Sequence, residues 1–143
     1  MIAHLTQQQI EAAVAQIARS FVDTPFRHQG RNPRTGLDCA GIGVCAYRLA
    51  GVDIIEHPAY RALPKEWDLE GPLRENGFEQ TTILGAGRVV QFAHPSERLK
   101  VHIGVLVSPR EFVHVLQNSK VHVESLSGRW GELHRATWER RVV

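Results

Sequence analysis

The sequence predicts an α+β fold, in which two N-terminal helices pack on a C-terminal antiparallel sheet. Apolar residues recur at helical intervals in the first third of the chain, whereas the last third contains short runs that alternate apolar and polar residues between turn residues. Helices that precede the strands are typical of an α+β layout, since an α/β chain alternates the two. A chain of 143 residues is long enough for one core and too short for two, so we expect a single domain over residues 1–143.

The first helix is expected over residues 7–21. Thr6 and Gln9 have the spacing of a capping box, in which each side chain accepts the other residue's backbone N–H. Apolar residues then recur at intervals of four, three and four, at Ile10, Val14, Ile17 and Phe21. The following segment, 23–36, contains two prolines, two glycines and three arginines, which indicates a loop.

The second helix is expected from Cys39 to Ala50, with Asp38 as its N-cap and Gly51 in the left-handed position that ends it. Residues 53–87 contain three prolines and no clean period, so we expect surface loops and a short helix there. The sheet should pack on the second helix. Its strands are expected at 88–92, 101–107, 111–116, 120–126 and 138–143.

Composition argues against several classes of function. The net charge is +2 and the 17 lysines and arginines are scattered without a long basic run, which argues against nucleic-acid binding. No apolar run approaches the ~20 residues of a membrane span, and the N-terminal residues lack the basic and apolar regions of a signal peptide. Cys39 and Cys45 lie six residues apart on the expected helix, so they point to different faces and should not form a disulfide.

A cysteine at the start of a helix is the strongest candidate for chemistry. Cys39 should lie beside unpaired N–H groups, whose partial positive charge favours the thiolate. His102 and His114, in two of the expected strands, supply a base and a third polar group. A thiolate–imidazolium pair should lower the pKa of Cys39 and raise that of His102. The backbone N–H of Cys39 is the expected oxyanion donor.

The geometry of one hairpin decides whether the two histidines can meet. A three-residue turn at 108–110 places His102 and His114 on one face of the sheet, beside Gly104, which leaves room for them. A two-residue turn would point His114 away. The remaining histidines show no metal-ligand spacing such as H-E-x-x-H, so we expect neither a metal nor a cofactor, and a zinc hydrolase is the less favoured alternative.

These residues resemble the NlpC-type cell-wall cysteine peptidases, which are papain-like enzymes that cut peptides in peptidoglycan. The resemblance implies that Cys39 is the nucleophile, His102 the general base, and His114 the group that orients the imidazole. It also implies that the substrate is an amide bond in the peptide stem of peptidoglycan. The matching segments are Thr24–Arg31, Gly36–Gly41, His102–Val105 and Phe112–His114.

The loop before the cysteine is most similar to the phage-tail branch of that family. This similarity implies a tail-tip protein with other tail proteins as partners, associated with the virion, or in the host cytoplasm before assembly. Phe26 stands where many relatives have a tyrosine, and His28 or Gln29 could replace its hydroxyl at the substrate. Arg27 and Arg31 could bind carboxylates of the peptide stem, or belong to a solvated basic loop. The alternative function is a catalytically silent structural module of a tail tip.

Overall fold

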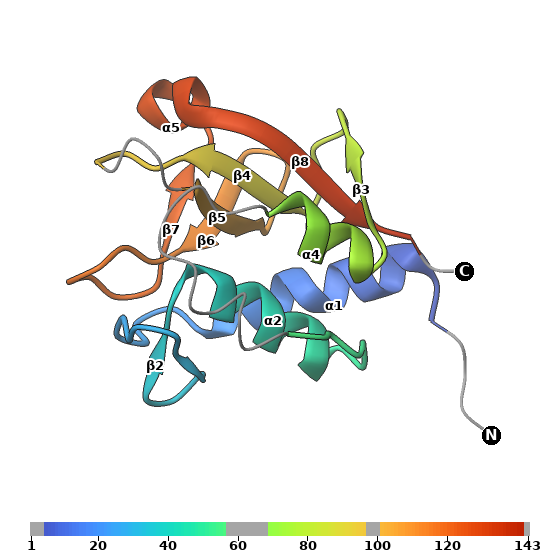
Figure 1. The fold of residues 1–143 in the computed structure, drawn as a ribbon, viewed down its shortest axis with the longest axis horizontal. Coiled ribbons are helices and arrows are strands. Elements are labelled where there is room, and N and C mark those ends of the chain that lie inside the picture. The colour runs from blue at the N-terminus through green and yellow to red at the C-terminus, as the bar shows by residue number, and fades with distance from the viewer. Residues whose placement is uncertain (1–4, 57–68, 97–100, 142–143) are drawn as a thin grey trace.

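The structure is a computed structural model, and it describes residues 5–56, 69–96 and 101–141. Helices α1 (Gln7–Ser20) and α2 (Cys39–Leu49) come first, and a six-stranded antiparallel sheet follows them (Figure 1). The α+β class expected from the sequence is therefore confirmed. Within the described ranges, no helix is long and apolar enough to cross a membrane.

The strands of the sheet run in the order β3-β8-β4-β5-β6-β7. They are β3 (Phe78–Thr81), β4 (Val89–Ala93), β5 (Val101–Leu106), β6 (Glu111–His114), β7 (His122–Ser125) and β8 (His134–Arg140). A separate antiparallel pair, β1 (Arg31–Asn32) and β2 (Gly36–Leu37), precedes α2. Two short helices, α4 (Glu70–Glu75) and α5 (Gly128–Leu133), flank the sheet (Figure 1).

Both helices begin at the residues expected from their capping signals. The Thr6 hydroxyl accepts the Gln9 backbone N–H at 3.1 Å, and the Gln9 side chain accepts the Thr6 backbone N–H at 2.8 Å. Asp38 caps α2 by accepting the Gly41 backbone N–H at 2.7 Å. Gly51 follows the end of α2 with a φ of 95°, the left-handed conformation expected of it.

The sheet packs apolar side chains on both faces, because residues alternate along each strand. One face packs against α1 and α2 through side chains such as Ile103, Val105 and Val113. The other face carries a smaller cluster of Val90, Phe92, Leu106 and Phe112, which Trp130 and Leu133 of α5 help to cover. The expectation that the sheet packs on the second helix is confirmed.

Four elements were not expected. Strands β1 and β2 form in and next to the segment 23–36, which was expected to be a loop. Strand β3 pairs with β8 at one edge of the sheet, and only its first residue, Phe78, is buried, so its sequence lacks a clear alternation. Helix α5 has six residues and no buried ones, too short for a periodic signal. Strand β8 also begins four residues before the expected position, at His134. Residues 57–68 and 142–143, which belong to expected loop and strand segments, lie outside the described residues.

Candidate active site

Cys39 is the first residue of α2 and its side chain is half-buried. The backbone N–H groups of Ala40 and Ile103 donate hydrogen bonds toward its sulfur. Ile103 is the neighbour of His102 in β5, so the start of α2 meets the sheet at the strand that carries the expected base. The structure thus brings the candidate nucleophile to β5, as the sequence predicts.

The expected acidic thiol is not found. Burial raises the pKa of Cys39 to about 12, and the neighbouring carboxylate of Asp38 raises it further. The N–H groups of Ile103 and Ala40 and the charge of Arg31 act in the opposite direction, but they do not compensate for the lost hydration. The resting thiol is therefore neutral, because desolvation of the thiolate outweighs the favourable helix start.

His102 and His114 lie side by side on the face of the sheet that carries Phe92. Nε2 of His102 is 2.8 Å from Nδ1 of His114, and both side chains are buried. The turn has the expected length, since Val107 donates its backbone N–H to the Glu111 carbonyl at 2.9 Å. The three-residue turn therefore brings the two expected histidines into hydrogen-bond contact.

The close approach of β5 and β6 depends on Gly104. A Cβ added at Gly104 would lie 2.7 Å from a ring carbon of Phe112 and 3.0 Å from the Val113 carbonyl oxygen. Real Cβ contacts are essentially never as short as 2.7 Å, so no other residue fits here without displacing the strand. The glycine leaves the room that the sequence predicted beside His102.

A carboxylate that the sequence analysis missed completes this line of side chains. Oε2 of Glu124 in β7 is 2.6 Å from Nε2 of His114. The sequence signal for Glu124 was the pairing of β6 with β7. This pairing sets His114 opposite His122, and Glu124, two residues after His122, lies on the same face of the sheet. The register of that pair could not be assigned from the sequence, because seven residues separate His114 from His122.

The three groups impose one arrangement of protons. A carboxylate only accepts hydrogen bonds, so Nε2 of His114 carries the proton that faces Glu124. Nδ1 of His114 is then bare and accepts a hydrogen bond from the N–H at Nε2 of His102. The remaining nitrogen of His102, Nδ1, has a free lone pair and can act as a base.

Both imidazoles are neutral at physiological pH. Burial lowers the pKa of His102 well below its usual 6.5, and the charge of a protonated His114 would lower it further. Burial, followed by the effect of His122, lowers the pKa of His114 to about 3. The expectation that His102 has a raised pKa is therefore wrong, since its desolvation in the sheet outweighs any attraction to the thiol.

Aromatic side chains from another element cover the histidines. The Trp130 ring of α5 lies 4.8 Å from the His114 ring and 5.5 Å from the His102 ring, measured between centroids. Phe92 of β4 lies 6.1 Å from His102. These rings limit access of water to the pair, which is the physical cause of the lowered pKa values. Trp130 was not expected at the site, because α5 itself was not.

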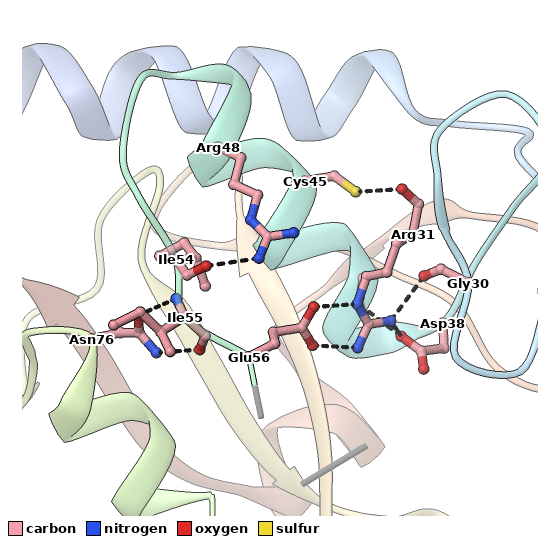
Figure 2. Close-up of polar contacts among 10 residues, drawn as sticks. Gly30, Arg31, Asp38, Cys45, Arg48, Ile54, Ile55, Glu56 and Asn76 are labelled. Carbon is pink, nitrogen blue, oxygen red and sulfur yellow. Dashed lines mark hydrogen bonds and ion pairs between the residues drawn. The ribbon is translucent and has the colours of Figure 1, made fainter. Parts of the chain in front are cut away.

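Arg31 takes a different role from the expected one. Its Nε and Nη2 bind the two carboxylate oxygens of Glu56 at 2.9 and 2.7 Å, and its Nη1 binds Asp38 at 2.7 Å and the Gly30 carbonyl at 2.8 Å (Figure 2). The guanidinium thus holds the residue that caps α2. With four hydrogen bonds already made inside the protein, Arg31 does not fit the expected role of binding a substrate carboxylate.

The other expected substrate contacts lie in the loop before β1. Arg27 and His28 are exposed, and Gln29 is half-buried with a φ of 56°. The loop is anchored to β2, since Arg27 donates its backbone N–H to the Leu37 carbonyl at 3.2 Å. Leu37 lies two residues before Cys39. The loop is therefore fixed close to the start of α2, and the roles of its side chains toward a substrate stay predictions.

An apolar cavity of about 60 Å³ adjoins this region, between α2, α4 and the sheet. Its wall includes Ala40 and Ile103, whose backbone N–H groups face the Cys39 sulfur. Glu56, the partner of Arg31, also lines it, and the rest is mostly apolar. An apolar space therefore lies beside Ala40, the residue that follows the candidate nucleophile.

Comparison with known proteins shows the family. The model of the NlpC/P60 family matches residues 23–140, a range that includes Cys39, His102, His114 and Glu124. The chain therefore belongs to the NlpC/P60 family. A comparison with curated proteins finds no significant match.

Solved structures share the fold at low sequence identity. An NLP/P60 family protein from Staphylococcus aureus subsp. aureus Mu50, described as similar to a lipoprotein, matches with a TM-score of 0.66 at 14% identity, over 99% of this chain and 44% of its own. An NlpC/P60 family protein from Bacillus cereus ATCC 10987 matches with a TM-score of 0.66 at 20% identity, over 96% of this chain and 43% of its own. The NlpC/p60 domain of the peptidoglycan hydrolase SagA matches with a TM-score of 0.62 at 21% identity, over 89% of this chain and 96% of its own. The chain thus spans less than half of the first two proteins and nearly all of the SagA domain.

Proposed function

We propose that the chain is a cysteine peptidase that hydrolyses an amide bond in the peptide stem of bacterial peptidoglycan. The observation that supports this most is the line from His102 through His114 to Glu124, which leaves Nδ1 of His102 bare in the strand that meets Cys39. Membership of the NlpC/P60 family and the fold shared with the SagA domain are consistent with this substrate. The proposal requires no cofactor.

In the proposed reaction, the Cys39 sulfur attacks the carbonyl carbon of the amide while Nδ1 of His102 takes the thiol proton. The carbonyl oxygen gains the negative charge and accepts a hydrogen bond from the backbone N–H of Cys39 at the helix start. The C–N bond then breaks, His102 donates its proton to the leaving amine, and a thioester remains. Water attacks the thioester as His102 takes its proton, and return of that proton to sulfur restores the enzyme.

The raised pKa of Cys39 determines when the proton moves. A resting ion pair would need a thiol of low pKa, whereas this thiol is neutral. The proton therefore transfers during attack on the substrate, with His102 as general base. His114 and Glu124 are positioning residues in this scheme, because they contact His102 or each other and not the reacting atoms.

A digest of purified muropeptides tests the proposal. We expect mass spectrometry to show a stem peptide cleaved with the addition of one water, and no cleavage by Cys39→Ala. Circular dichroism of both proteins controls for folding. A folded parent protein that leaves every muropeptide intact would contradict the proposal.

The neutral thiol also favours a second candidate, the silent structural module. In such a module Cys39 would never act as a nucleophile, and its pKa of about 12 would simply reflect burial. Cleavage in the muropeptide digest that depends on Cys39 would exclude this candidate.

For the biological setting, we propose a phage or prophage tail tip, where the protein would open the cell wall. The support is the similarity of Pro25–Gln29 to the phage-tail branch of the family. Mass spectrometry of purified tail particles from a lysogen that encodes the chain should then detect it in stoichiometric amounts. Its absence from such particles would contradict this placement.

A further inference from the structure

A third side chain joins the outer end of the histidine line. His122 faces His114 across the β6–β7 pair, and its Nε2 is 3.3 Å from the Glu124 oxygen that also binds His114. One ligand atom from each of His114, His122 and Glu124 lies within 4.8 Å of the other two. Two imidazoles and one carboxylate form a ligand set that zinc binds in proteins.

The hydrogen bonds of His122 leave its Nε2 available to a metal ion. Its Nδ1 is 2.7 Å from the Lys120 carbonyl oxygen, which only accepts, so Nδ1 must carry a proton. In the neutral ring Nε2 is then bare, yet it faces a carboxylate oxygen that also only accepts. A metal ion between these two acceptors can bind both lone pairs. A backbone carbonyl on Nδ1 is also the usual support of a metal-bound histidine.

We propose that His114, His122 and Glu124 form a binding site for a zinc ion. A tetrahedral zinc with bonds of about 2.1 Å has ligand atoms roughly 3.4 Å apart. The 3.3 Å between His122 and Glu124 already matches this spacing, and the 2.6 Å between His114 and Glu124 has to open by less than one ångström. The His122 and Glu124 side chains are 39% and 36% exposed, so the ion can enter from solvent and water can fill the fourth position.

Zinc at this site would reverse the protons of the proposed catalytic line, and this step rests on the proposed function. A metal bound to Nε2 of His114 leaves the proton of that ring on Nδ1, which then donates to Nε2 of His102. The proton of His102 accordingly moves to Nδ1. Both rings stay neutral, and any proton on Nε2 of His122 passes to solvent. With Nδ1 protonated, His102 cannot take the thiol proton, so bound zinc inhibits hydrolysis.

The binding experiment uses zinc chloride and does not depend on activity. The background is Cys39→Ala, which removes the thiol as a competing ligand. Isothermal titration calorimetry should show one zinc per chain, and His122→Ala or Glu124→Gln in that background should weaken binding about tenfold or more. His28→Ala, which removes an exposed histidine from the loop before β1, should leave the affinity unchanged. Absence of binding, or undiminished binding in the folded His122→Ala variant, would overturn the site.

The second experiment measures hydrolysis of muropeptides with and without zinc, each protein against its own zinc-free rate. Zinc should inhibit the parent strongly and His122→Ala weakly at the same free concentration. Equal inhibition of both would mean that zinc acts elsewhere, for example on the Cys39 thiol, and would overturn the inhibitory role. A parent that binds zinc at this site but cleaves no muropeptide would contradict the proposed function while the binding result still supports the site.

Discussion

The direction of the hydrogen bonds among His102, His114 and Glu124 determines which nitrogen of His102 can act as a base. Each imidazole ring can carry its proton on only one nitrogen in this line, because the Glu124 carboxylate accepts hydrogen bonds and never donates them. In the proposed mechanism, Glu124 thus controls the proton of His102 without contacting the reacting atoms, through the His114 ring. This dependence makes Glu124 the most informative side chain to change.

We predict that Glu124→Gln lowers kcat on muropeptides by about ten- to a hundredfold with little effect on KM. The glutamine amide can turn its N–H groups toward His114, which removes the requirement for a proton on Nε2 and permits the inactive arrangement. Steady-state kinetics under a chelator measures the effect. Glu79→Gln, on the opposite edge strand β3, makes the same change away from the site and should keep parental kinetics. Equal kinetics in both variants would refute the role of Glu124.

Alkylation of the thiol tests the neutral resting state of Cys39. Because burial raises its pKa to about 12, the rate with iodoacetamide should still rise with pH above the ~8.5 of a free thiol. The measurement is made in Cys45→Ala, so that only Cys39 reports. A rate that reaches its plateau below neutral pH would show a stable thiolate and contradict the neutral thiol.

Strands β5, β6 and β7 build the site through their register, and α2 contributes the cysteine at its first residue. Helices α1 and α2, their caps and the β5–β6 hairpin could be predicted because their signals are local: a capping residue, an apolar period and a turn length. Glu124, Arg31 and Trp130 could not be placed, since each depends on a partner from a segment distant in the sequence. The pKa directions failed for the same reason, because the sequence does not show how deeply Cys39 and His102 are buried.

Substituting Gly104 should disturb the β5–β6 pair. We expect Gly104→Ala to lower the free energy of unfolding by about 1–3 kcal/mol, as overpacking does, because the new methyl group meets Phe112 and the Val113 carbonyl. Urea denaturation measures it. Gly43→Ala in α2 is the matched control: its methyl group would lie 3.8 Å from Val105, and it should stabilise the helix by about 0.5–1 kcal/mol. A neutral Gly104→Ala would contradict the packing described.

The buried histidines of β5 and β6 should make the fold sensitive to acid. Above pH 6.5 the folded and unfolded states both hold neutral rings. Below it, the unfolded chain binds protons that the folded state does not, because folding lowers the pKa of His102 and His114. As the pH drops below 6.5, the free energy of unfolding should therefore decrease by ~1.4 kcal/mol per pH unit for each histidine.

Urea denaturation at several pH values between 7.5 and 4, with a chelator present, measures this slope. His114→Asn removes one of the two titrating groups, so its slope below pH 6.5 should be shallower than that of the parent. Superimposable slopes would show that His114 is not held neutral by the fold.

At the scale of the whole molecule, two cores meet at the site. The helices cover one face of the sheet and present Cys39 to strand β5, while α5 and the aromatic cluster cover the face that holds the histidines. Strand β7 supplies an acidic partner for His114 and a neighbouring His122. Both lie on the β7 edge strand, so the outermost strand provides the means to tune, and with zinc to inhibit, the proposed chemistry.

Rates of muropeptide hydrolysis for Cys39→Ala, His102→Ala and the double variant test the central claim most directly. If thiol and imidazole act as one unit, either substitution alone removes nearly all activity and the double variant is no slower than either. The three proteins should also keep the parental circular dichroism spectrum. Substantial hydrolysis by either folded single variant, or losses that add in the double variant, would contradict the account.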